Sequence, residues 1–219
     1  LRQAYFNNAE VLPMWVADMD FETPEFIRKA VIERAQHPIY GYSFRTDDYY
    51  QSIMAWLKVR WHWEAEKDWL LFSPGIVPGV NFAVQSLTAP GDGVMVQPPV
   101  YFPFFDAVKS NGRRLVQNPL VEHNGRYEID YDNLEASARE SSMLLLSSPH
   151  NPVGRCWNRE ELLRLGEICR KHNVIVIADE IHGDLIMPGY KHIPLASLAP
   201  EIADITVTCI APSKTFNLA

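Results

Sequence analysis

The chain has 219 residues, of which 47% are hydrophobic and 21% are charged, close to the averages of globular proteins. This composition excludes a disordered tail and a fibrous repeat. The net charge of -7 argues against a nucleic-acid partner and against a basic face that docks on a membrane. No apolar run approaches the roughly 20 residues of a membrane span, and the scattered cysteines are typical of reduced thiols. We therefore expect a cytoplasmic protein.

The first half of the chain alternates predicted helices with short predicted strands. Apolar side chains recur at helical spacing in three segments, so we expect helices at 23–36, 49–61 and 77–87. Short apolar runs bounded by glycine and proline predict strands at 69–72 and 94–96.

The second half repeats this alternation more clearly. Continuous apolar runs predict strands at 143–146, 174–178 and 205–210, and Asn158 followed by Glu161 marks the start of a helix. Strands without polar alternation are typical of parallel sheets that are buried on both faces. We therefore predict an α/β protein, a three-layer sandwich with a mostly parallel central sheet. In such sheets ligands bind at the carboxyl ends of the strands.

The segments that follow the predicted strands carry unusual residues. The first is a glycine turn at 73–79 that opens a helix, where free backbone N–H groups form a natural phosphate site, although a plain tight turn has the same pattern. The second is a loop stiffened by proline around Asn151, whose amide can donate to a ligand oxygen, with an Asn-Pro turn as the alternative. Both patterns are ambiguous when taken alone.

Two further strand ends carry charge. Asp179 directly follows a buried strand, where a carboxylate is costly unless a cation meets it. Lys214 follows the last predicted strand and is either an ion-pair partner or an amine able to form a Schiff base. A metal site made of Asp179, His182 and Asp184 is a further alternative, but these groups are close in sequence and no second His-rich segment supports them. We expect no metal.

The order of these segments is more specific than any one of them. A glycine turn, an aromatic loop, Asn-Pro-x-Gly, Asp-Glu-Ile-His and Ser-Lys follow one another at 73–79, 98–104, 151–154, 179–182 and 213–214. In this order the chain resembles the fold-type I pyridoxal-phosphate enzymes, the aspartate aminotransferase superfamily. Within it, the chain is most similar to the MalY/PatB branch of cystathionine β-lyase-type C–S lyases, and segments 14–21, 39–42 and 211–217 add to this resemblance.

The resemblance implies a role for each candidate residue. Lys214 would hold pyridoxal 5'-phosphate as a Schiff base and then remove the Cα proton, Asp179 would pair with the pyridine nitrogen, and Asn151 would bind the ring 3-oxygen. The other implied contacts are His182 near the same oxygen, Tyr101 and Ile181 on the two ring faces, Ile76 N–H, Val77 N–H and the Ser213 hydroxyl on the phosphate, Tyr42 (or Tyr40) on the phosphate of a neighbouring subunit, and segment 15–18 beside the substrate.

The resemblance also implies an activity and a domain organisation. The expected activity is α,β-elimination from cystathionine or a cysteine S-conjugate to a thiol, pyruvate and ammonia by a homodimer that takes a small sulfur amino acid. A class I/II aminotransferase and a regulatory protein without turnover are the alternatives. Residues 1–44 would contribute to a small domain and 45–219 would form the large cofactor domain. Because the chain lacks a starting Met and ends shortly after Lys214, we expect a piece of a longer enzyme.

Overall fold

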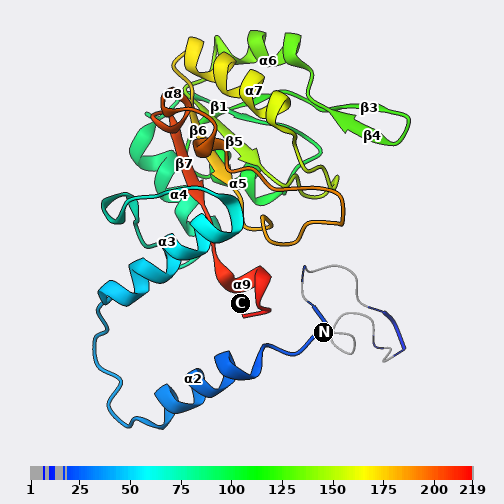
Figure 1. Ribbon diagram of the computed structural model, residues 1–219. Helices are drawn as coiled ribbons and strands as arrows, with labels where there is room; N and C mark the ends of the chain where they lie inside the picture. The colour runs from blue at the N-terminus through cyan, green and yellow to red at the C-terminus, as the bar shows by residue number, and fades with distance from the viewer. Residues whose placement is uncertain (1–6, 8–9, 13–16, 18, 219) are drawn as a thin grey trace. The chain divides into compact units, whose positions relative to one another are not determined.

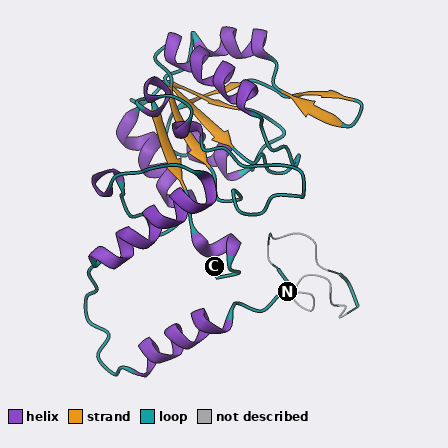
Figure 2. Ribbon diagram, viewed as in Figure 1, coloured by secondary structure: helices purple, strands orange, loops and turns teal. Residues whose placement is uncertain are grey.

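The computed structural model describes residues 7, 10–12, 17 and 19–218. The chain divides into two compact units (Figures 1 and 2). The sheet unit is Ser43–Ala211, and the terminal unit joins Leu1–Tyr42 to Pro212–Ala219.

The centre of the sheet unit is a five-stranded sheet in the order β2-β1-β5-β6-β7. All of its strand pairs are parallel, which confirms the predicted α/β fold with a mostly parallel sheet. Its strands are β1 (Gly93–Val96), β2 (Arg114–Gln117), β5 (Met143–Ser147), β6 (Ile175–Asp179) and β7 (Thr206–Cys209).

Helices cover both faces of this sheet and complete three layers (Figure 1). Strand β5 shows why its sequence is continuously apolar: Met143 and Leu145 pack on one face, and Leu144 and Leu146 pack on the other. The first face is covered by α4 (Ile76–Leu87) and α5 (Pro103–Lys109), and the second by α6 (Tyr131–Ala138), α7 (Arg159–Lys171) and α8 (Pro200–Ala203).

The remaining elements are short, except for two helices near the start of the chain. The sheet unit also contains α3 (Asp47–Trp61), the 3-10 turns η1 (Lys67–Trp69) and η2 (Leu195–Ser197), and an antiparallel hairpin of β3 (Val121–His123) and β4 (Arg126–Glu128). The terminal unit contains α2 (Glu25–Gln36) and α9 (Pro212–Thr215). No helix among the described residues is long and apolar enough to cross a membrane.

Most of the predicted elements are confirmed, and the start of α7 is confirmed in detail. The Asn158 side chain accepts a hydrogen bond from Glu161 N (2.8 Å), and the Glu161 carboxylate accepts one from Asn158 N (2.8 Å), which is the capping box that the sequence predicts.

The strand predicted at 69–72 is wrong. Trp69 ends η1, and the residues after it form no strand. Leu71 is 95% exposed and Phe72 is 58% exposed, so this apolar run lies at the surface of the sheet unit and is not part of its core. Apolar character alone therefore gave a false strand, because pairing with a neighbouring strand is what makes one.

The terminal unit is held together by Asn217. Its side-chain amide donates to Met19 O (2.9 Å) and to Phe21 O (3.0 Å), and the Thr23 hydroxyl donates to Asn217 O (2.8 Å). These bonds fix the segment before α2 against the segment after α9.

Candidate functional site

The carboxyl ends of β5, β6 and β7 lie side by side and place candidate residues at one edge of the sheet. Ser147 is in register with Asp179, which is in register with Cys209 on its other side. The backbone pairing continues past the strands, because Ser148 N donates to Asp179 O (3.0 Å) and Glu180 N donates to Cys209 O (2.9 Å). The loops that follow β5 and β6 therefore start from fixed, adjacent points.

Asp179 is a buried carboxyl group without a cationic partner among the described residues. It is 7% exposed, and its Oδ1 accepts a hydrogen bond from Ile181 N (3.2 Å). Burial is the main reason why the pKa of Asp179 is raised to about 6; the hydrogen bond from Ile181 N opposes this rise, and the negative charge of neighbouring Glu180 adds to it. A positively charged group of a ligand would relieve this cost, which fits the expectation from the sequence.

The Asp179 carboxyl borders a narrow crevice between the sheet and the helices α4 and α5. Apart from this carboxyl, the lining is apolar and consists of Ile76, Val77, Val80, Pro103, Phe104 and Ala107. An apolar lining excludes water from the carboxyl group, and this explains why its pKa is high.

The amino end of α4 lies beside the same crevice, where Ile76 and Val77 are part of the lining. Helix α4 starts at Ile76 after Gly75, and its first N–H groups have no acceptor within the helix. Its first turn contains no acidic residue that would occupy them. A phosphate at Ile76 N and Val77 N, together with a cationic group at Asp179, would therefore be compatible with one bound molecule.

The loop after β5 holds the backbone of Asn151 tightly. The Asn151 N–H donates to Ser147 Oγ (3.0 Å), and His150 N donates to Arg155 O (2.7 Å), so the loop closes on itself. Asn151 is half-buried, and its side-chain amide makes no hydrogen bond to another described residue. The amide is therefore positioned by its backbone and available to a ligand.

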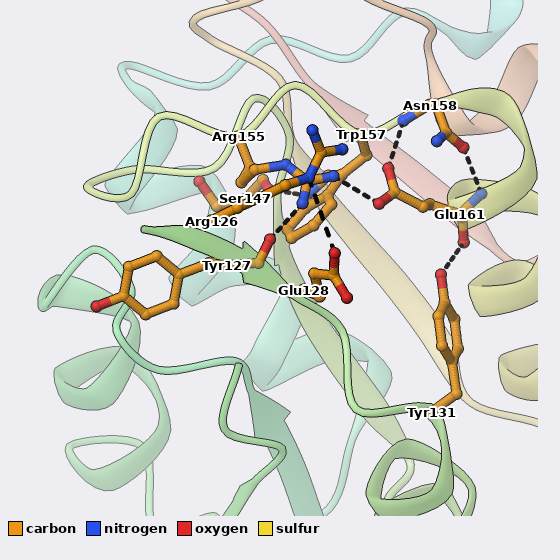
Figure 3. A network of polar contacts seen from close by, with 9 residues as sticks. All are labelled: Arg126, Tyr127, Glu128, Tyr131, Ser147, Arg155, Trp157, Asn158 and Glu161. Carbon is orange, nitrogen blue, oxygen red and sulfur yellow. Dashed lines mark hydrogen bonds and ion pairs between the residues drawn. The ribbon is translucent and has the colours of Figure 1, made fainter. Parts of the chain in front are cut away.

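Arg155 anchors this loop to its surroundings (Figure 3). Its guanidinium group donates to Tyr127 O, pairs with Glu161 Oε1 (2.5 Å) and lies over the Trp157 ring, 4.5 Å from the ring centroid. The Trp157 indole in turn donates to Ser147 O (3.2 Å), at the start of the loop. Arg155 was not predicted from the sequence; the signal for it was an arginine directly after the Asn-Pro-x-Gly motif.

The other candidate residues of the sheet unit lie near these strand ends. Ile181 and His182 are half-buried in the turn after β6. Tyr101 is half-buried between β1 and α5, and its ring meets the Phe104 ring edge-on with centroids 6.1 Å apart. Phe104 lines the crevice at Asp179, so the Tyr101 ring packs against a residue of the crevice lining.

The candidates Tyr42, Ser213 and Lys214 belong to the terminal unit. Ser213 and Lys214 lie in α9, and Lys214 Nζ donates to Ala17 O (2.9 Å). Tyr42 is fully exposed at the end of its segment of this unit. Of the segment expected to border the substrate, 15–18, only Ala17 belongs to the described residues.

The alternative of a metal site finds no geometric support in the part of the chain that the structure describes. No group of three or more His, Cys, Asp or Glu side chains there could hold a metal ion. Asp184 is instead engaged with helix α3, accepting hydrogen bonds from Trp56 Nε1 (3.0 Å) and Arg60 Nε (3.0 Å).

Comparison with known proteins places the chain in a family. The family model for aminotransferase class I and II matches residues 9–219. The chain belongs to this family. The match confirms the resemblance that the order of the motifs indicates.

Individual members of this aminotransferase family show a narrower similarity. The chain is 50% identical to cystathionine beta-lyase PatB of Bacillus subtilis (strain 168) over 216 residues, which cover 98% of the chain and 56% of PatB. A PLP-bound putative aminotransferase from Clostridium difficile 630 is 44% identical with a TM-score of 0.94, covering 99% of this chain and 56% of that one. A PLP-bound C-S lyase from Staphylococcus hominis is 37% identical with a TM-score of 0.92, covering 99% and 56%. The chain thus spans just over half the length of these relatives.

Proposed function

We propose that this chain is part of a pyridoxal-phosphate-dependent C–S β-lyase that acts on cystathionine or a related cysteine S-conjugate. The observation that carries the proposal is the buried Asp179 carboxyl, which lacks a cationic partner among the described residues and lies in a crevice beside the amino end of α4. The 50% identity to a cystathionine beta-lyase and the likeness to a C-S lyase structure support this choice within the family.

The residues of the sheet unit fit this cofactor. A pyridinium nitrogen would supply the cation that Asp179 lacks, and a phosphate would accept from Ile76 N and Val77 N. Asn151 would donate its amide to the ring 3-oxygen, with His182 near the same oxygen. The half-buried side chains of Tyr101 and Ile181 would cover the two ring faces and exclude water.

In the proposed reaction the cofactor supplies an electron sink for the electrons left at Cα. Lys214 would hold the cofactor through its amine and, once the substrate amine has replaced it, would take the proton from Cα. Asp179 would keep a proton on the ring nitrogen, and the Ser213 hydroxyl would contribute to phosphate binding. The expected products are a thiol released from Cβ, pyruvate and ammonia, with one water consumed.

The partner and domain assignments belong to the same proposal. The substrate is a small sulfur amino acid, and the functional unit is a cytoplasmic homodimer in which Tyr42, fully exposed here, reaches the phosphate of the second subunit. Residues 1–44 contribute to the small domain, and residues 45–219 contribute the large cofactor domain.

The test uses the full-length protein with cystathionine. We expect pyruvate and free thiol to form in equal amounts without any 2-oxo acid. If amino-group transfer appears only after a 2-oxo acid is added and no thiol is released, the protein is an aminotransferase and the lyase proposal is wrong. A preparation that binds the cofactor but performs neither reaction would point to the regulatory alternative.

A further inference from the structure

Two adjacent carboxyl groups at the end of β6 have contrasting surroundings. Asp179 borders the apolar crevice, whereas the side chain of Glu180 is completely buried and fully bonded. Glu180 Oε2 lies 2.9 Å from His192 Nε2, and Glu180 Oε1 accepts from Leu195 N (3.0 Å). Burying an ionisable pair costs desolvation energy, which can cancel the attraction between the two groups. A gain in stability alone therefore does not explain why this pair is buried.

The surroundings of this pair are closely packed. The His192 side chain is 2% exposed, and its ring meets the Trp61 ring edge-on with centroids 4.9 Å apart. Gly183 fills the space next to both rings: a Cβ at this position would come within 2.7 Å of His192 Cδ2 and of Trp61 Cζ2. The turn after β6 therefore rests against these rings through a glycine backbone.

The far end of the same turn is fixed to α3. The Asp184 carboxylate accepts from Trp56 Nε1 and Arg60 Nε, both at 3.0 Å, and its side chain is only 7% exposed. Segment 180–184 is thus bonded at its first residue through Glu180 and at its last through Asp184, and we call these two attachments the turn clamp.

The residue that contacts Asp179 lies inside the clamped turn. Ile181 N donates to Asp179 Oδ1 (3.2 Å), and the turn closes through Gly183 N to Glu180 O (2.9 Å). Since the backbone between two fixed ends has little freedom, the clamp determines where this N–H group points. His182, a candidate for the ring 3-oxygen, is carried by the same turn.

We infer that Glu180, His192 and Asp184 are positioning residues for Asp179: the turn clamp holds the Ile181 N–H on Asp179 Oδ1 and thereby orients the carboxylate for a pyridinium nitrogen. This inference rests on the proposed function. According to this inference, the buried Glu180–His192 pair affects cofactor binding indirectly, through Asp179.

The first test compares two matched substitutions in the full-length protein. Glu180→Gln keeps the shape and the acceptor for Leu195 N but removes the charge that pairs with His192. Glu135→Gln removes the charge of a partly exposed carboxylate in α6 that pairs with His172 Nε2 (2.7 Å), just after α7, and also with Lys171 and Arg139. Outer partners of metal-binding side chains are typically worth about 10- to 100-fold in affinity or activity, and we expect an effect of the same order here. We therefore expect Glu180→Gln to weaken pyridoxal 5'-phosphate binding about tenfold or more, and Glu135→Gln to leave it unchanged.

The second measurement follows the bound cofactor directly. The pH at which its visible absorption band changes reports protonation of the Schiff-base nitrogen, which responds to the charge that Asp179 would hold on the ring nitrogen, and a purely structural role would not move it. We expect this pH to shift in Glu180→Gln and to stay constant in Glu135→Gln. Unchanged affinity and an unchanged band in Glu180→Gln would overturn the inference.

The Asp184 end of the clamp provides a second variant, in which the buried Glu180–His192 pair stays intact. Asp184→Ala removes the acceptor for α3, and Asp47→Ala removes the acceptor of the exposed pair with Lys67 (2.6 Å) at the start of the same helix. We expect Asp184→Ala, but not Asp47→Ala, to reproduce the shifted band. Equal bands in both variants would contradict the clamp.

The failure of the inference is distinguishable from failure of the proposed function. If the unmodified protein does not bind pyridoxal 5'-phosphate, the proposed function is wrong. If it binds the cofactor and cleaves cystathionine but the clamp variants behave like their controls, only the positioning role is wrong.

Discussion

At the carboxyl ends of the strands, the two faces of the sheet differ in whether their buried ionisable side chains have partners. On the side of α7 and η2, Arg155 is paired with Glu161, and Glu180 is paired with His192. On the side of α4 and α5, Asp179 is equally buried, yet no described residue offers it a cation. The paired groups shape the loops, and the unpaired group is where we propose that a ligand supplies the missing charge.

The largest effect is expected from removing the amine that we propose to bind that ligand. Lys214→Ala in the full-length protein should lower the rate of pyruvate release from cystathionine by about 10⁴-fold or more, because one residue both holds the cofactor and moves the Cα proton. A cofactor-linked lysine can be mapped by reducing the bound form with borohydride and sequencing the labelled peptide. Label on another lysine would contradict the assignment.

The next effect concerns the unpaired carboxyl itself. Asp179→Asn should still bind the cofactor but lose about 10²- to 10³-fold in turnover, because a neutral amide cannot retain the ring proton, and each pKa unit is worth about 1.4 kcal/mol. The measurement is kcat with the cofactor at saturation. Turnover close to that of the unmodified protein would mean that Asp179 has only a structural role.

On the side of α7, removal of the Arg155 charge should lower the stability of the fold, because this charge is paired with Glu161. Arg155→Met leaves the Glu161 carboxylate without its partner, and breaking such a pair should lower the free energy of unfolding by about 3 kcal/mol. Arg126→Met is the control, because the Arg126–Glu128 pair is exposed and 3.9 Å long, and should cost less than about 1 kcal/mol. Urea denaturation of both variants measures the difference, and equal losses would refute the distinction.

The smallest expected effect is a gain in the free energy of unfolding when Asp179 is replaced by Asn in the cofactor-free protein. Burial raises the pKa of Asp179 from 3.8 to about 6, so the folded state prefers the protonated form. The cost is absent at pH values below the unfolded pKa. It grows as the pH rises toward the folded pKa and then stays constant. Two pKa units correspond to about 3 kcal/mol at most.

Cofactor-free Asp179→Asn should therefore be more stable than the cofactor-free unmodified protein above pH 7, and the advantage should vanish near pH 4. Thermal or urea unfolding across this pH range measures it. Asp132→Asn, an exposed residue in the first turn of α6, should show no such trend. A stability difference that does not depend on pH would mean that the charge of Asp179 is already balanced.

Strands that are buried on both faces were predicted correctly from the sequence. Strands β5 and β6 are apolar on both faces, so their positions and their parallel arrangement follow from composition alone. Strand β2 was missed because it has four residues, of which Arg114 and Gln117 are exposed. The false strand at 69–72 shows the opposite error, since its apolar residues lie at the surface.

The candidate site was predictable in part. The cost of a carboxylate that directly follows a buried strand is visible in the sequence and identifies Asp179, and the burial of this side chain confirms that cost. Arg155 and the Glu180–His192 pair were not foreseen, because their partners are brought together by loops and turns that have no periodic pattern. The roles of Lys214 and Tyr42 came from the family resemblance and remain predictions.

The bonds of Asn217 have a consequence for the order in which the chain matures during synthesis. Its amide reaches Met19 O across 198 residues of chain, so the segment before α2 leaves the ribosome long before its partner exists. At about 5–20 residues per second, this wait lasts on the order of ten to forty seconds. During that interval the segment before α2 lacks the partner that fixes it in the folded structure. The rate of translation between these two segments should therefore influence the yield of correctly folded protein.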